Sequence, residues 1–205
     1  MEVVAAKPLY FTQIGLFEYS LVAYPDVVVS EKVLVEKQNL AKALSPGITS
    51  KTRPHITIAN FRATESMEET IIRYTQRVCS LQPAFSVELN NYSGFPPHTI
   101  YLRVQNPQPF KNLAHKLKVV ANYINSCSCP PASFKNHPHI TISEKIPESL
   151  YTAALMEYAQ KTFHEVFMLN QLVLLRRNNQ YETCKNIQVF HLQPSDYKPS
   201  TNTLY

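Results

Sequence analysis

The pentapeptide Pro-His-Ile-Thr-Ile occurs twice in this chain, at 54–58 and again at 138–142. Isoleucine and threonine are β-branched, which favours a strand over a helix. Alternate residues of a strand face the same side, whereas on a helix this pair of side chains would point to nearly opposite sides. Each copy therefore predicts a strand that presents an imidazole beside a hydroxyl, His55 with Thr57 and His139 with Thr141.

Two imidazoles that face each other can divide the work of acid–base catalysis. A neutral imidazole takes a proton from an attacking water, and a protonated one gives a proton to the leaving oxygen. Both forms exist near neutral pH because an unperturbed histidine has a pKa of about 6.5. Threonine hydroxyls can donate hydrogen bonds to the non-bridging oxygens of a phosphate. His55 and His139 are the candidate catalytic residues, Thr57 and Thr141 the candidate phosphate ligands, and this chemistry requires no metal or other cofactor.

The same order of elements surrounds both copies of the pentapeptide. In the first half the patterns predict a strand at 17–24, a helix at 27–45 stopped by Pro46-Gly47, a helix after a capping-box pattern at Ser66 and Glu69, and a strand at 84–89. In the second half they predict a strand at 99–104, a helix over 110–124, a helix from 147, and strands at 165–177 and 186–192. A repeated order of elements with a repeated pentapeptide indicates an internal duplication.

Two His-x-Thr-x motifs in the two halves of such a chain resemble those of the two-histidine (2H) phosphoesterase superfamily. That superfamily includes 2′,3′-cyclic nucleotide phosphodiesterases and bacterial 2′-5′ RNA ligase-like proteins. The resemblance covers residues 17–192 and implies an α+β fold of two pseudo-twofold-related lobes of antiparallel sheet, with outer helices and the site in the central cleft. We expect one bilobal domain over 1–196, followed by a loose tail at 197–205. Residues 17–98 would form one lobe and residues 99–192 the other, and each lobe could also contain strands from the other half of the sequence.

The resemblance also implies an activity, that of a metal-independent phosphoesterase acting on a 2′,3′-cyclic phosphate or a 2′-5′-linked nucleotide or RNA. Two alternatives stay open, a non-catalytic RNA- or nucleotide-binding module of the same fold and 2′-5′ RNA ligase activity. The net charge of +5 suits an anionic partner of this kind. Only 3 glycines occur in 205 residues, which argues against a glycine-rich phosphate loop.

Four further residues are candidate substrate contacts. Arg53 precedes the first pentapeptide and could contact a phosphate. Phe95 and Tyr181 lie in turn-like segments and could stack on a base. Arg176 and Arg177 end a predicted strand, so that one faces the cleft and the other points away, and Arg176 is the candidate.

A zinc-dependent hydrolase is a third alternative. Cys127, Cys129, His137 and His139 lie close together in the sequence and are residue types that zinc prefers. Their C-x-C spacing is unusual for zinc, however, and the first half has no counterpart. No apolar run is long enough to span a membrane, and the start of the chain lacks the pattern of a secretory signal. We therefore expect a cytoplasmic monomer with reduced cysteines, Cys79 being on the buried side of a helix.

Overall fold

The computed structural model describes residues 15–44, 52–179 and 181–194. Its strands are β1 (Leu16–Ala23), β2 (Ile56–Thr64), β3 (Phe85–Phe95), β4 (Thr99–Val104), β5 (Ser133–Phe134), β6 (His139–Ser143), β7 (His164–Leu169), β8 (Gln171–Arg177) and β9 (Lys185–His191). Its helices are α1 (Val27–Leu44), α2 (Glu68–Cys79), α3 (Gln108–Lys116), α4 (Lys118–Ser126) and α5 (Glu148–Ala159), and a short 3-10 turn, η1 (Glu65–Met67), precedes α2.

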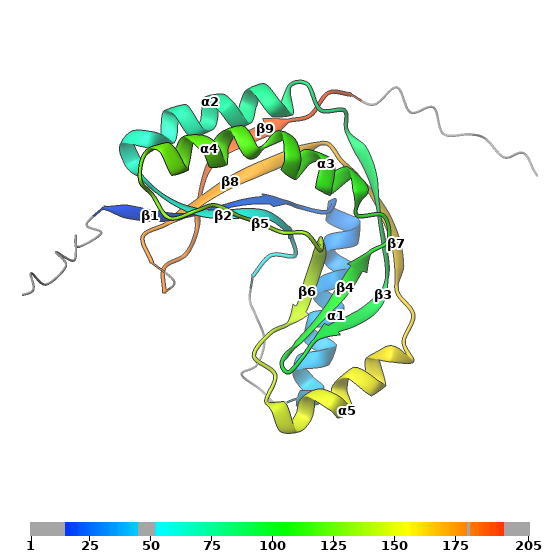
Figure 1. Ribbon diagram of the computed structural model, residues 1–205. Coiled ribbons are helices and arrows are strands. Elements are labelled where there is room, and N and C mark those ends of the chain that lie inside the picture. Colours follow the sequence, from blue (N-terminus) through cyan, green and yellow to red (C-terminus); the bar gives the residue numbers. More distant parts are fainter. Residues whose placement is uncertain (1–14, 45–51, 180, 195–205) are drawn as a thin grey trace, which may run out of the picture.

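One antiparallel sheet runs through the molecule in the order β7-β3-β4-β6-β2-β1-β8-β9, with β5 attached to β2. β2 and β6 pair through Ile56 and Ile140, near the first residue of each strand. The sheet bends at this seam into a first lobe (β2, β1, β8, β9) and a second lobe (β6, β4, β3, β7) (Figure 1). β2 and β6, and likewise β1 and β4, lie at matching places on the two sides of the seam. The predicted α+β fold with two related lobes of antiparallel sheet is confirmed.

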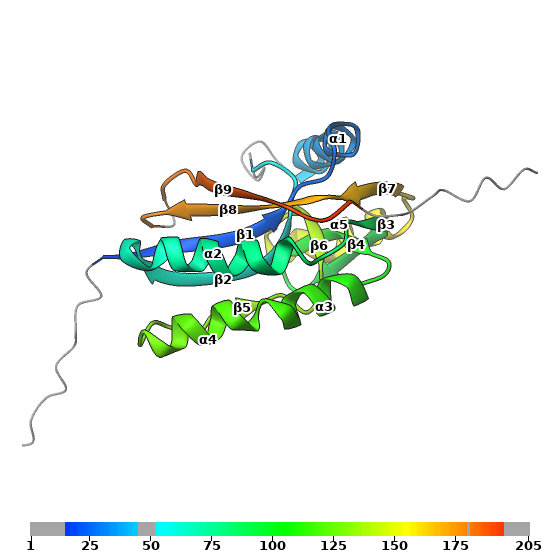
Figure 2. The same ribbon diagram turned by 90° about the horizontal axis from the view of Figure 1, so that it is seen from above.

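Several elements of each half pack in the opposite lobe. β3 belongs to the first half of the sequence but pairs with β4 and β7, while β8 and β9 return to complete the sheet beside β1. α1 packs against β6, and α5 against β3, whereas α3 and α4 lie with α2 over the first lobe (Figures 1 and 2). The two lobes are therefore bound to each other by exchanged strands and helices.

The hydrophobic core lies between the sheet and these helices. The apolar series predicted as one helix over 110–124 is buried along its length, at Phe110, Leu113, Leu117, Val120 and Ile124. The chain divides this stretch into α3 and α4 at Leu117. The predicted strand at 99–104 coincides with β4. These segments were predictable because each buries one regularly spaced set of side chains.

Two further predictions differ from the structure. The stretch 165–177 is not one strand: β7 and β8 are separated at Asn170, where the chain crosses from the second lobe to the first. A run of apolar residues predicts that a segment is buried, but it does not predict which strand the segment pairs with. The sequence therefore did not reveal this crossing. The capping box is also absent, because α2 begins at Glu68 and the Ser66 hydroxyl lies 2.9 Å from Thr64 Oγ1 within the preceding turn.

Some expectations concern residues outside the described ranges. They are the helix stop at Pro46-Gly47 and the tail at 197–205. Within the described part of the chain, no helix has the length and apolar character needed to cross a membrane. The four cysteines are free in this structure. Cys79 is buried on α2, which confirms the prediction for that residue.

Candidate active site

The seam between β2 and β6 determines where the two pentapeptides lie. Ile56 and Ile140 are directly opposite each other and point into the core, with exposed fractions of 0% and 1%. Side chains alternate along a strand, so the histidine and threonine of each copy face the other side of the sheet. The burial of two isoleucines thus forces both polar pairs onto the open face.

Across the seam, the antiparallel register sets the histidine of one copy beside the threonine of the other. His55 lies across from Thr141, and Thr57 lies across from His139. A cavity of about 190 Å³ is lined by His55, Thr57 and Thr141 together. The first motif and the threonine of the second therefore line one cavity, while His139 is beside it, across the seam from Thr57.

Backbone carbonyls orient both imidazoles in the same way. The Nδ1 of His55 lies 2.8 Å from the carbonyl oxygen of Arg53, and the Nδ1 of His139 lies 2.7 Å from that of His137. A carbonyl only accepts hydrogen bonds, so each Nδ1 carries the proton and donates it. Nε2 is then the nitrogen left for substrate, as an acceptor in the neutral ring and a donor in the protonated ring.

The surroundings of the two imidazoles favour their neutral form. Burial lowers the pKa of both His55 and His139 below the ordinary value of 6.5, because it penalises the charged ring. The backbone hydrogen bonds act in the opposite direction. Positive charges, Lys37 near His55 and Lys135 near His139, lower the pKa further. At neutral pH each Nε2 is therefore able to accept a proton.

Aromatic rings flank both histidines. Phe95 and Tyr101 are stacked with their centroids 4.3 Å apart, and they lie 5.1 and 4.9 Å from the imidazole of His139. On the other side of the seam, the ring of Tyr24 lies edge-on to His55 at 6.2 Å. Phe95 is thus one predicted contact that the structure brings to the site.

A groove leads from His55 along the first lobe. A second cavity, of about 520 Å³, shares Thr52 and His55 with the first and is also lined by Tyr24 and Arg53. A third, of about 440 Å³, shares Ser20 and Arg177 with the second. The three cavities are therefore contiguous over the face of the sheet that carries the histidines.

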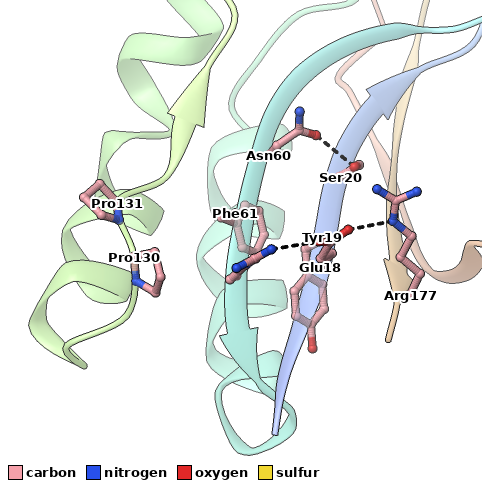
Figure 3. A pocket seen from close by; sticks show the side chains of 9 residues that line it. Glu18, Tyr19, Ser20, Asn60, Phe61, Pro130, Pro131 and Arg177 are labelled. Carbon is pink, nitrogen blue, oxygen red and sulfur yellow. Dashed lines mark hydrogen bonds and ion pairs between the residues drawn. The ribbon is translucent and has the colours of Figure 1, made fainter. Parts of the chain in front are cut away.

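The far end of this groove carries an excess of positive charge. Figure 3 shows Glu18 of β1 beside Arg177 of β8, with Pro130 and Pro131 along the border. Glu18 accepts hydrogen bonds from Arg62 at 3.0 Å and from Arg177 at 2.8 Å. Burial raises the pKa of Glu18, but these two hydrogen bonds outweigh it, so that the pKa lies below its ordinary value. Two guanidinium groups thus meet one ionised carboxylate.

The two arginines at the end of β8 face opposite sides of the sheet. Arg176, the predicted contact, donates hydrogen bonds to Glu65 at 2.9 Å and Glu68 at 3.0 Å, and its guanidinium lies 4.6 Å from the ring of Phe17. These partners lie on the helix-covered face, so the structure does not bring Arg176 to the groove. Of these two arginines, Arg177 is the one that lines the groove.

The remaining predicted contacts border the groove to different degrees. The guanidinium of Arg53 lies 4.0 Å over the ring of Tyr24 and lines the second cavity. Tyr181 is 88% exposed, and its neighbour Glu182, rather than Tyr181 itself, lines that cavity. Arg53 is therefore near the site, whereas Tyr181 lies outside the groove.

Lys37 and Glu144 line the 190 Å³ cavity beside His55 but were missed from the sequence. Lys37 is on α1, which packs against β6, and only 5% of it is exposed. A signal existed, since Lys37 continues the buried series Val29, Val33 and Leu40 at helical spacing. A lysine within an apolar stripe is a candidate functional residue.

The alternative zinc ligands do not gather. Cys127 is exposed, and the Sγ of Cys129 lies 3.6 Å from the Sδ of Met67. Over residues 15–44, 52–179 and 181–194, no three or more histidine, cysteine or acidic side chains are grouped to hold a metal ion. The proposed quartet of Cys127, Cys129, His137 and His139 therefore gains no support.

A family model described as the 2′-5′ RNA ligase superfamily matches residues 29–180, which include both pentapeptides. The chain belongs to this superfamily. The match confirms the resemblance to 2H phosphoesterases that the two motifs predicted. No curated protein matched this superfamily member in a sequence comparison.

Solved structures share the fold of this 2′-5′ RNA ligase superfamily member. Escherichia coli LigT complexed with 3′-AMP has a TM-score of 0.63 at 14% identity, with 87% of this chain and 98% of LigT covered. LigT complexed with ATP has a TM-score of 0.65 at 14% identity, with 86% and 98% covered. The protein TT0787 of Thermus thermophilus has a TM-score of 0.64 at 16% identity, with 85% and 97% covered. At these identities the likeness shows the fold.

Proposed function

We propose that this protein is a phosphoesterase that hydrolyses a 2′,3′-cyclic phosphate or a 2′-5′ linkage, with His55 and His139 as the acid–base pair. The observation that carries the proposal is the pairing of the two motifs across the seam. It places two imidazoles, each anchored through Nδ1, beside two hydroxyls on one face. The complexes of LigT with 3′-AMP and ATP add support for a nucleotide ligand.

The reaction follows from the atoms available at the seam. Thr57 and Thr141 donate hydrogen bonds to non-bridging oxygens and hold the phosphate in line. The Nε2 of one neutral imidazole takes a proton from water as the water oxygen forms a bond to phosphorus. The bond from phosphorus to the ribose oxygen breaks, and the other, protonated imidazole gives its Nε2 proton to that oxygen. Ligation would use the same two proton transfers with a 5′-hydroxyl in place of water: its oxygen bonds to the phosphorus of the cyclic phosphate, the bond to the ribose 3′-oxygen breaks, and that oxygen takes the proton.

The groove favours a substrate longer than one nucleotide. The Phe95–Tyr101 pair beside His139 can stack one base. On the other side of the scissile phosphate, the groove continues past His55 with Arg53 and Arg177 along it. A second nucleotide would place its phosphate near these guanidinium groups. This arrangement supports a 2′-5′-linked oligonucleotide alongside the cyclic phosphate.

The decisive experiment measures hydrolysis of the four nucleoside 2′,3′-cyclic phosphates and a 2′-5′-linked dinucleotide in excess EDTA. We expect turnover of at least one substrate, undiminished by EDTA, because imidazoles supply both proton transfers. The product isomer identifies the bond that breaks. Binding of every substrate without turnover would contradict the proposal and favour the nucleotide-binding module. Activity lost in EDTA and restored by Zn²⁺ would contradict the metal-independent mechanism.

The threonines should contribute less than the histidines. Thr57→Val and Thr141→Val keep the shape of the side chain but remove one donor to the phosphate. A hydrogen bond to a charged group contributes about 1.5–3 kcal/mol, so each change should lower kcat/KM roughly 10- to 100-fold. Thr57→Ser and Thr141→Ser, which keep the hydroxyl, are the matched controls. Steady-state kinetics with full activity in both valine variants would remove the threonines from the mechanism.

A further inference from the structure

Lys37 is buried with little of the compensation that a buried charge normally has: burial lowers the pKa of its ammonium, and the charge of Glu144 opposes this only in part. Only 5% of the residue is exposed, and its Nζ donates a hydrogen bond of 3.1 Å to the carbonyl oxygen of Thr52. An ammonium has three donors. No carboxylate among the described residues forms an ion pair with Lys37 within 4.0 Å. An apolar residue on this face of α1 would avoid the desolvation cost of the ammonium.

Lys37 also borders the cavity beside His55. Lys37 lines the same 190 Å³ space as His55, Thr57 and Thr141. Apart from Lys37, these groups are neutral hydroxyls and an imidazole whose neutral form is favoured. The other charged residue in the lining is Glu144, an exposed carboxylate that repels an anion. A phosphate bound here needs a cation, and the ammonium is the positive group in this lining.

We propose that Lys37 is the cationic ligand of the substrate phosphate. Its ammonium binds a non-bridging oxygen from the α1 side while Thr57 and Thr141 bind from the strands. The role rests on the proposed function, because it names the residue that offsets the phosphate charge in that reaction. It also explains a lysine in an apolar stripe, since the stability lost by burying the ammonium is recovered when the anion binds.

A purely structural role is the competing explanation, in which Lys37 tethers the backbone at Thr52. The two roles predict opposite effects of removing the charge. Lys37→Met keeps an apolar stem and removes a buried charge, so a phosphate ligand predicts an unchanged or higher Tm. A tether predicts a lower Tm. Lys37→Gln keeps a donor for the carbonyl of Thr52 but removes the charge.

The experiment titrates inorganic phosphate into the full-length protein by isothermal titration calorimetry. We expect Lys37→Met and Lys37→Gln each to weaken phosphate binding by about 10- to 100-fold. Lys42→Met is the matched control, because Lys42 is an exposed lysine on the same helix. Affinity within about twofold of wild type in both variants would overturn the proposal. So would a wild type that shows no saturable binding of phosphate.

Kinetics separate this inference from the proposed function. If phosphate affinity depends on Lys37 but the wild type turns over no phosphodiester, the phosphate site stands and the enzymatic proposal fails. If the wild type turns over substrate and both variants keep its kcat/KM, the enzymatic proposal stands and the role of Lys37 fails.

Discussion

His139→Ala should lower kcat/KM for the preferred substrate by about 10²- to 10⁴-fold, and His55→Ala should lower it by a similar factor. General acid–base catalysis by a positioned group contributes an effect of this size. Each variant removes the Nε2 that either takes the proton from water or gives one to the leaving oxygen. The loss should appear mainly in kcat, because the threonine hydroxyls still bind the phosphate. Steady-state kinetics at the pH optimum measure it.

His164→Ala is the matched control for these variants. Its imidazole is on β7, is 63% exposed and lies 3.6 Å from Glu88, away from the cavity. We expect this variant to keep wild-type kinetics. The double variant of His55 and His139 should lose little more than either single variant, because the two act in one step. A His55 or His139 variant that is folded and fully active would refute the assignment.

The second large effect is on the pH dependence. The reaction needs one neutral and one protonated imidazole, so kcat/KM should follow a bell-shaped profile. Burial disfavours the charged ring and lowers the pKa of both His55 and His139, so each becomes protonated only at lower pH. Both limbs therefore move in the acid direction, and the optimum of kcat/KM should lie below the ordinary histidine pKa of 6.5. Beyond each limb the rate should fall about tenfold per pH unit.

Stopped assays between about pH 4 and pH 9 in buffers of constant ionic strength test this profile. A variant that lacks one histidine should keep a low residual rate, and its pH profile should lack the limb that the titration of this histidine produces. Bound substrate phosphate favours the protonated rings, so the optimum of kcat should lie at higher pH than that of kcat/KM. A rate that rises steadily to the alkaline end of this range would be inconsistent with a protonated imidazole as the acid.

Local patterns were sufficient to predict much of this protein. β4 and the buried series over α3 and α4 follow from side-chain periodicity, which depends only on the conformation of each segment. The alternation in Ile-Thr-Ile likewise determines that His55 and Thr57 share one face of a strand. The repeat of that pentapeptide indicated two matching halves and the family to which the chain belongs.

Tertiary structure decided how the site is assembled. The pairing of Ile56 with Ile140 sets the two motifs side by side, and it depends on contacts between residues distant in the sequence. The place of β8 beside β1 likewise decides that Arg177 lines the groove while Arg176 meets Glu65 and Glu68. Periodicity within one segment holds no information about such long-range neighbours.

Lys37 shows the same division most clearly. Its position in an apolar stripe of α1 is a property of the sequence by itself. The site that Lys37 reaches is decided by the tertiary structure, because α1 packs on β6 of the opposite lobe. The sequence alone determined which side chains could perform phosphoester chemistry. Only the exchange of elements between the lobes decided which of them meet, because that exchange depends on long-range packing.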